Sequence, residues 1–328
     1  MTRDPYRSHL NCSALSKTYR LDQLTTGTEG ECQNTEPFVL CCMPFVVRKA
    51  FFCFEIEKGI TVKKRKTVID IGLMKQQQDK ITVLTAYDYP FAQLMDRVGI
   101  DMILVGDSVG SVFSGYDNTL PVTLEEMIYH SKAVVRGSQQ ALVVTDMPFM
   151  SYQIDERDAR LNAGRLIKEG GAQAVKLEGG EHMAATIRAI VDIDIPVVGH
   201  IGLTPQSIHR MGGFKVQGRE EEQARRILAD AKAVEDAGAF AVVLEGIPRG
   251  LAQQVTESLD IPTIGIGAGS DCDGQVLVIH DILGLCDKYS PKFVKRYADI
   301  STTISDGIEA YIKEVKSGEF PTIDHSFK

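Results

Sequence analysis

The stretch AVKLEGG, residues 174–180, sets a lysine and a glutamate two residues apart in a short apolar run that ends in two glycines. Side chains two residues apart on a β-strand point to the same face, so Lys176 and Glu178 should share one face. A strand that is buried on both faces offers no ordinary place for a cation and an anion. The pair therefore indicates either an internal ion pair or a functional site at the end of a buried strand.

Seven similar runs occur in the chain, each rich in aliphatic residues and each ending in a polar residue or glycine. They cover residues 81–88, 102–108, 141–148, 196–203, 240–248, 262–269 and 275–284. Stretches with helical spacing separate most of them: 123–137, where Thr123 and Glu126 form a capping-box pattern, and 155–172 and 219–239. Continuous apolar strands that alternate with helices indicate right-handed βαβ units around a buried parallel sheet. Eight such units predict a (β/α)8 TIM barrel.

A doubly wound open sheet is the main alternative to the barrel. Its dinucleotide-binding fingerprint is absent, because Ser270 replaces the third glycine in GIGAGSDCDG, residues 265–274. The run at 275–284 follows this segment too closely for a full crossover helix, so the eighth strand is the least regular part of the pattern.

Composition excludes several classes of protein. The 328 residues are 44% hydrophobic and 24% charged, with a formal charge of −8, which argues against a nucleic-acid binder that works through a basic face. No apolar run approaches the roughly 20 residues that span a bilayer. Seven cysteines, an odd number with no CxxC pair, fit a reducing compartment, so a cytoplasmic location is expected.

The first 66 residues differ in character from the rest, so we expect a poorly structured N-terminal extension at 1–66 and a catalytic barrel at 67–328. The extension contains an apolar patch, FVLCCMPFVV, and the basic run KKRK at 63–66. Three interpretations stay open: a flexible extension, a targeting or regulatory segment, or upstream sequence that a wrongly assigned start codon includes.

Carboxylates follow three consecutive predicted strands, namely Asp107, Asp146 and Glu178. Active sites of (β/α)8 barrels lie at the C-terminal ends of the strands, so these side chains should converge. Three neighbouring carboxylates repel one another unless a cation lies among them. Ligation by oxygen alone favours Mg²⁺ over zinc. For a single aspartate such as Asp88 we instead expect a helix N-cap.

Two further residues extend this site. His200 follows the run at 196–199 and could equally be an ordinary buried histidine, whereas Glu245 ends a very apolar strand and could act as a general base. Lys176 could hold an anionic substrate group beside the metal. A divalent metal, a lysine and an opposed carboxylate suggest enolate chemistry on a 2-oxo acid.

Several motifs resemble the ketopantoate hydroxymethyltransferase family over residues 67–328. They include TAYDYPFA, VGDSVG, DMPFMSY, VKLEGG, GHIGLTPQ, VLEGIP and the tail FPTIDHSF. The GGFKVQGR segment, residues 212–219, looks like the active-site loop of that family, with Phe214 where tyrosine is common and Lys215 beside it. The resemblance assigns no role to residues 1–66.

This resemblance implies a barrel of the phosphoenolpyruvate/pyruvate type, a homodecamer, and transfer of a hydroxymethyl group from 5,10-methylenetetrahydrofolate to 3-methyl-2-oxobutanoate. Its implied residues are Mg²⁺ ligands Asp107, Asp146 and Glu178, substrate contacts Asp107, Ser108, Asp146 and Lys176, the proton acceptor Glu245, and His200 in the active site. A related 2-oxo acid lyase or mutase is an alternative, although the KKCGH-type loop of such enzymes is missing from the sequence. A non-catalytic barrel scaffold is another alternative.

Overall fold

The computed structural model describes residues 64–285 and 291–328. Of the two units into which the chain divides, Met1–Val62 and Lys63–Lys328, the second contains all of the described residues. The three interpretations of the N-terminal extension therefore fall almost entirely outside the described residues. Arg65 and Lys66 already contact the barrel, since Lys66 N donates to Gln140 O at 2.7 Å and Arg65 Nη1 donates to Gln173 Oε1 at 2.9 Å.

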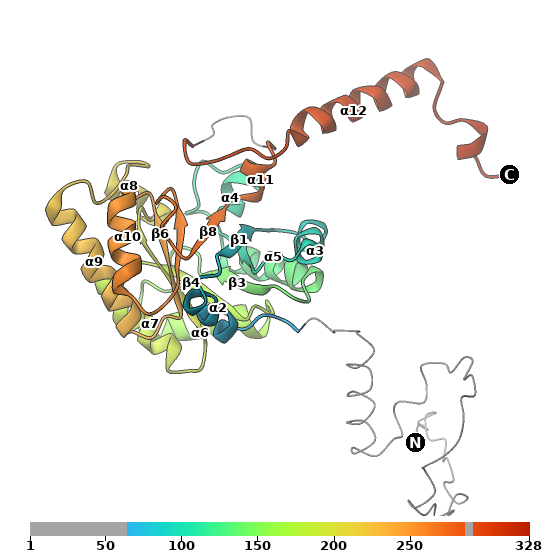
Figure 1. The fold of residues 1–328 in the computed structure, drawn as a ribbon. Coiled ribbons are helices and arrows are strands. Elements are labelled where there is room, and N and C mark those ends of the chain that lie inside the picture. The colour runs from blue at the N-terminus through green and yellow to red at the C-terminus, as the bar shows by residue number, and fades with distance from the viewer. Residues whose placement is uncertain (1–63, 286–290) are drawn as a thin grey trace, which may run out of the picture. The chain divides into compact units, whose positions relative to one another are not determined.

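Eight parallel strands form a closed barrel in sequence order, which confirms the predicted (β/α)8 architecture (Figure 1). The strands are β1 (Ile81–Thr85), β2 (Met102–Val105), β3 (Leu142–Asp146), β4 (Ala174–Glu178), β5 (Val197–Gly202), β6 (Ala241–Glu245), β7 (Thr263–Ile266) and β8 (Gly274–Leu277). β8 pairs with both β7 and β1, and this pairing closes the barrel.

The longer helices that connect the strands are α3 (Tyr89–Val98), α5 (Leu124–Gly137), α6 (Glu156–Lys168), α7 (Ala184–Val191), α9 (Glu221–Asp236) and α10 (Arg249–Ser258). Short turns of helix after the strands are α4 (Val109–Val112), η3 (Glu181–Met183), η4 (Pro205–Ser207), α8 (Ile208–Met211) and α11 (Ile279–Ile282). α2 (Val68–Gln76) precedes the barrel, and α12 (Ile300–Ser317) and η5 (Ile323–His325) follow it. Asp88 caps α3, and Thr123 with Glu126 forms the capping box of α5, both as predicted.

The buried side chains form two layers, and strand alternation decides which layer each joins. Inside the barrel lie residues such as Ala174, Val144 and Val243, together with Ile71 and Met74 from α2. The layer between strands and helices contains the alternate residues, such as Val175 and Leu177 of β4. Residues 176 and 178 share the parity of Ala174 and therefore point into the barrel, which confirms the predicted common inward face.

The predicted eighth strand, 275–284, is wrong over its second half. The strand ends at Leu277, and residues 279–282 form α11, so Asp281 lies in a helical turn and not at a strand end. The backbone turns here because Ile279 N donates to Thr85 Oγ1 at 3.1 Å and Asp281 N donates to Val278 O at 3.1 Å. A short continuous apolar run does not distinguish a strand from a buried helical turn by its periodicity. Among the described helices, none is long and apolar enough to cross a membrane.

Candidate active site

The three predicted carboxylates lie together at the C-terminal end of the barrel. Asp146 and Glu178 are the last residues of β3 and β4, and Asp107 follows β2 by two positions. All three are buried, at 4%, 3% and 6% exposure for Asp107, Asp146 and Glu178. The backbone N–H of Asp107 donates to Asp146 Oδ2 at 3.0 Å, which joins the ends of β2 and β3.

Lys176 lies inside the same group, one strand from Asp146. Its Nζ is 3.1 Å from Asp146 Oδ1 and 3.2 Å from His200 Nδ1. Burial alone would lower the pKa of Lys176, but the carboxylates of Asp146, Glu178 and Asp107 outweigh burial and raise it. The ammonium group therefore stays charged and faces the centre of the site.

The carboxylates differ in how easily they lose a proton. Burial, followed by the charges of Asp146 and Glu178, raises the pKa of Asp107 to about 8. Burial also raises the pKa of Asp146, although Lys176 acts in the opposite direction. For Glu178, burial would raise the pKa, but the contact with His200 and the charge of Lys176 outweigh it and lower the pKa. The three carboxylates therefore disfavour one another's charged forms, most strongly at Asp107.

These residues fit a divalent cation in charge and in atom type. Asp146 Oδ1 is buried and already faces the Lys176 ammonium at 3.1 Å, and a cation would lower the raised pKa of Asp107 by offsetting its neighbours. The ligand atoms would be carboxylate oxygens alone, which suits Mg²⁺. Within residues 64–285 and 291–328, no three acidic, histidine or cysteine side chains already stand in a metal-binding arrangement. Lys176 and Gln206 contact oxygens of the carboxylate group.

His200 connects Glu178 to Glu245. Its Nδ1 lies 3.5 Å from Glu178 Oε1 and its Nε2 lies 3.1 Å from Glu245 Oε2. Burial and Lys176 would lower the pKa of His200, but the two glutamates outweigh them and raise it to about 9. Lys176 can donate to Nδ1 only when that nitrogen is unprotonated, whereas Nε2 faces Glu245 as an ion pair when the imidazole is charged. The structure therefore places His200 and Glu245 beside the carboxylate group, where the family resemblance would put them.

Ser108 lies beside Asp107, where its Oγ is 2.8 Å from the hydroxyl of Tyr87. Close packing fixes this turn, because a Cβ at Gly106 would lie 2.6 Å from Ser108 Oγ. Tyr87 is 2% exposed and was not predicted as a site residue, since it precedes the expected N-cap Asp88 in a segment that looked purely structural. Lys215 lies outside this group, in an exposed loop whose Gln217 N donates to Gly246 O at 2.8 Å.

Sequence reasoning missed Gln206 and Tyr152, which lie directly against the carboxylates. Gln206 Nε2 donates to Asp107 Oδ2 at 2.9 Å, and its backbone N–H donates to Glu178 Oε2 at 2.9 Å. The Tyr152 hydroxyl lies 2.6 Å from Gln206 Oε1. The sequence signal for Gln206 as a site residue was its position four residues beyond the end of β5. An uncharged residue after a proline does not by itself indicate a functional site.

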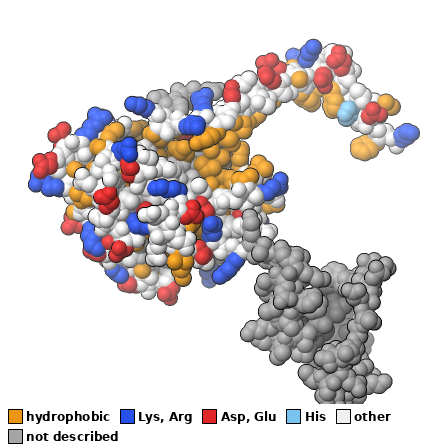
Figure 2. Space-filling model, in the orientation of Figure 1, with side chains coloured by type: hydrophobic (Ala, Val, Ile, Leu, Met, Phe, Trp, Pro, Cys, Tyr) orange, Lys and Arg blue, Asp and Glu red, His pale blue; other side chains and the backbone are white. Residues whose placement is uncertain are grey.

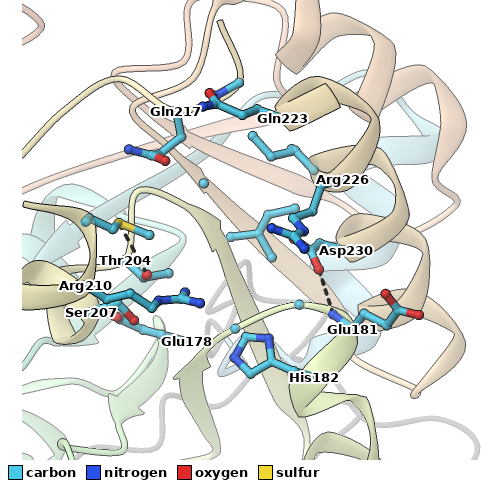
Figure 3. Close-up of a pocket in the computed structure, with 17 residues that line it drawn as sticks. Glu178, Glu181, His182, Thr204, Ser207, Arg210, Gln217, Gln223, Arg226 and Asp230 are labelled. Carbon is cyan, nitrogen blue, oxygen red and sulfur yellow. Dashed lines mark hydrogen bonds between the residues drawn. The ribbon is translucent and has the colours of Figure 1, made fainter. Parts of the chain in front are cut away.

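A polar cavity of about 590 Å³ opens beside Glu178, between β4, β5 and α9. Figure 3 shows Arg210 of α8 and Arg226 of α9 on opposite sides of it, with His182 and Glu178 at its lower edge. The cavity gives the carboxylate group a solvent-connected neighbour large enough for part of a second substrate.

Sequence comparisons match the chain to known proteins of one family. A family model described as ketopantoate hydroxymethyltransferase matches residues 65–323. The 3-methyl-2-oxobutanoate hydroxymethyltransferase of Geobacter metallireducens is 72% identical over 266 residues, which cover 81% of this chain and 100% of that protein. The protein of the same name from Syntrophotalea carbinolica is 71% identical over the same shares.

Solved structures show the same fold at low sequence identity. The crystal structure of 2,3-dimethylmalate lyase, a PEP mutase/isocitrate lyase superfamily member, matches with a TM-score of 0.52 and 18% identity, covering 80% of this chain and 91% of that one. Phosphonopyruvate hydrolase in complex with oxalate and Mg²⁺ matches with a TM-score of 0.51 and 11% identity, covering 77% and 91%. The family match spans nearly all of the barrel and the relatives align over their full length. The chain belongs to the ketopantoate hydroxymethyltransferase family.

Proposed function

We propose that this enzyme transfers a hydroxymethyl group from 5,10-methylenetetrahydrofolate to 3-methyl-2-oxobutanoate, giving 2-dehydropantoate for pantothenate biosynthesis. Its relatives that are 65–72% identical bear the name of this activity. The observation that carries the proposal is the buried group of Asp107, Asp146 and Glu178 with Lys176 among them, at the catalytic end of a barrel.

In this proposal one Mg²⁺ per subunit would be held by Asp107, Asp146 and Glu178. When bound, the ion polarises the keto group of the substrate and makes the neighbouring C–H bond more acidic. The fit rests on three buried carboxylates that lie together at one end of the barrel and on the raised pKa of Asp107.

The remaining steps belong to the side chains of this chain. Lys176 and Ser108 would hold the substrate carboxylate, since Lys176 stays charged and Ser108 Oγ is fixed by Tyr87. Glu245 would accept the proton from C3, and His200, with Nε2 toward Glu245, would keep that carboxylate oriented.

In the proposed reaction, C3 of the substrate loses a proton to the base and forms a carbon–carbon bond to the one-carbon unit. Water supplies the hydroxyl oxygen, and both bonds from the one-carbon unit to folate nitrogens break, so that tetrahydrofolate leaves. C3 already carries two methyl groups, so the product has a quaternary carbon there.

Two other functions make different predictions. A 2-oxo acid lyase or mutase would use the same metal and lysine but would act without folate. A scaffold would make no use of Lys176 or Glu178, yet both are buried and charged at the barrel's catalytic end. Analysis of products with and without 5,10-methylenetetrahydrofolate separates the three functions.

Self-association is part of the proposal, with a homodecamer in the cytoplasm as the finer expectation. None of the residues of α12 is buried, although Ile304, Ile308, Tyr311, Ile312 and Val315 form an apolar stripe with helical spacing. A groove of about 800 Å³ on β1 and β8 is lined by apolar residues that include Leu84, Leu277 and Phe293. Figure 2 shows hydrophobic side chains gathered over this part of the barrel. A second copy of this chain would cover such surfaces.

Substitution of the carboxylates tests the proposed function. Glu178→Ala and Asp146→Ala should each reduce metal-dependent formation of 2-dehydropantoate by about 100-fold or more, because each removes a predicted metal ligand. Product is measured by NMR, with circular dichroism to verify folding. The control is Glu222→Ala, on the exposed first turn of α9, which should retain activity. Full activity in either site variant would refute the metal assignment.

A further inference from the structure

Gln206 has an unusual position among the charged residues of the site. It lies in η4 directly after Pro205, is 7% exposed, and contacts two carboxylates that come from non-adjacent strands. Its side-chain Nε2 reaches Asp107 after β2, while its backbone N–H reaches Glu178 at the end of β4. One residue therefore spans two of the three predicted metal ligands.

The amide of Gln206 can take only one orientation. Nε2 donates to Asp107 Oδ2 at 2.9 Å and to Met147 O at 3.0 Å, while Oε1 accepts from Tyr152 at 2.6 Å and from Gln153 Nε2 at 3.1 Å. These four contacts use both donors and both acceptor positions of the side chain. A flipped amide would set its oxygen against a carboxylate and a carbonyl, which would be repulsive.

Tyr152 closes this network into a loop. It is 1% exposed, and its hydroxyl accepts from Glu178 N at 3.1 Å while it donates to Gln206 Oε1. The same tyrosine thus fixes the backbone at Glu178 and the amide that holds Asp107. This network contacts Asp107 Oδ2 and Glu178 Oε2. The second oxygen of each carboxylate, Asp107 Oδ1 and Glu178 Oε1, is not part of the network.

We propose that Gln206, oriented by Tyr152, is a positioning residue that fixes the carboxylates of Asp107 and Glu178 for binding of a divalent cation. The inference deepens the proposed function, since it takes those carboxylates as ligands. Gln206 donates three N–H hydrogen bonds in this region without adding a charge. It therefore restrains the carboxylates, whereas a second lysine would compete with the cation for them.

The test measures binding of Mn²⁺ alone to the metal-free enzyme, by calorimetry and by electron paramagnetic resonance, with no substrate present. Gln206→Met retains the length of the side chain and the backbone N–H but loses the amide, and Tyr152→Phe loses only the hydroxyl. Each should weaken Mn²⁺ binding by about 10- to 100-fold, as expected for groups that orient metal ligands. The double variant should bind little more weakly than Gln206→Met, because both residues act through one network.

Gln173→Leu is the matched control. Gln173 also bridges buried elements, accepting from Val143 N at 3.0 Å and from Arg65, but it lies at the opposite ends of β3 and β4. This control should lower the melting temperature and leave Mn²⁺ affinity unchanged.

The outcomes separate this inference from the proposed function. Unchanged Mn²⁺ affinity in folded Gln206→Met and Tyr152→Phe, with normal binding in the parent enzyme, would overturn the positioning role and leave the function intact. Weakened binding in both variants would support it even if the parent enzyme formed no 2-dehydropantoate. Failure of the parent enzyme to bind any divalent cation would overturn both.

Discussion

Lys176 was the residue that did not fit an apolar strand, and its surroundings explain why it is tolerated. It is 5% exposed, and its ammonium group lies within 3.1 Å of Asp146. A buried charge is costly unless it is paired, and a buried pair seldom adds net stability over apolar residues. The cost of burying Lys176 therefore indicates that the site was selected for binding or chemistry and not for stability.

At the residue scale, strand alternation was sufficient to predict which side chains of a strand point into the barrel. Lys176, Glu178, Asp146, His200 and Glu245 all occupy the inward positions of their strands. Gln206 and Tyr152 could not be predicted in this way, because they come from irregular segments after the strands, where no periodicity fixes the direction of a side chain.

Asp96 gives a residue-scale prediction about stability and pH. Its Oδ1 accepts from Gln140 N and Ala141 N, both at 2.8 Å, and from Ser138 Oγ at 3.1 Å. Burial would raise the pKa of Asp96, but these hydrogen bonds outweigh burial and lower it. A lowered pKa stabilises the fold above the unfolded carboxyl pKa of about 4, and this contribution is lost as the pH falls through the folded pKa.

Asp96→Asn should therefore lower the free energy of unfolding by about 1 kcal/mol at pH 7, with a smaller difference below pH 4. Urea denaturation at a series of pH values measures this difference. Asp117→Asn, at an exposed position, serves as the control and should differ little from the parent at any pH. A difference for Asp96→Asn that grows on acidification would contradict the account.

At the element scale, the sequence predicted most helices and strands because each has its own local signals. The capping box of α5 and the Asp88 cap of α3 are examples. The end of β8 could not be predicted, because the apolar residues of 275–284 serve first a strand inside the barrel and then α11. Only tertiary contacts, such as the hydrogen bond from Ile279 N to Thr85, decide between the two.

Close packing of α5 on α3 gives an element-scale prediction. A Cβ at Gly137 would lie 2.6 Å from Tyr89 O and 2.9 Å from Ala92 Cβ, so neither helix could keep its place. Gly137→Ala should lower the free energy of unfolding by about 1–3 kcal/mol despite the better helix propensity of alanine.

Gly164 provides the matched control for this substitution. It lies in α6 with no heavy atom within 4 Å of an added Cβ, so Gly164→Ala should raise the free energy of unfolding by about 0.5–1 kcal/mol. Chemical denaturation of both variants measures the contrast. Equal effects of the two substitutions would show that the contact between α3 and α5 is not tight.

At the scale of the whole molecule, the barrel could be predicted from its eight repeats, whereas its surfaces could not. Periodicity shows that α12 has an apolar face, but it does not show what covers that face. In the described residues, all of α12 is solvent-accessible, and the groove on β1 and β8 is open. These two exposed apolar features support the proposed self-association, which no single element would determine by itself.

Ile308→Glu tests this expectation. Ile308 lies in the middle of the apolar stripe and is 54% exposed, so a charge there should disrupt an interface without disturbing the barrel. Light scattering after size-exclusion chromatography should give a smaller particle than the parent. Lys313→Glu places the same residue on the opposite side of α12 and should leave the particle size unchanged. Equal particle sizes for the parent and Ile308→Glu would remove α12 from the interface.

The proposed function requires this barrel to remove the C3 proton of a 2-oxo acid with the help of a divalent cation. The most direct measurement is exchange of that proton for deuterium in 3-methyl-2-oxobutanoate, followed by NMR in D₂O with and without Mg²⁺. We expect exchange that requires Mg²⁺ and is at least about 100-fold slower in Glu245→Gln, with Glu257→Gln as the unaffected control. Exchange at the parent rate in Glu245→Gln, or no exchange by the parent enzyme under any condition, would refute this step.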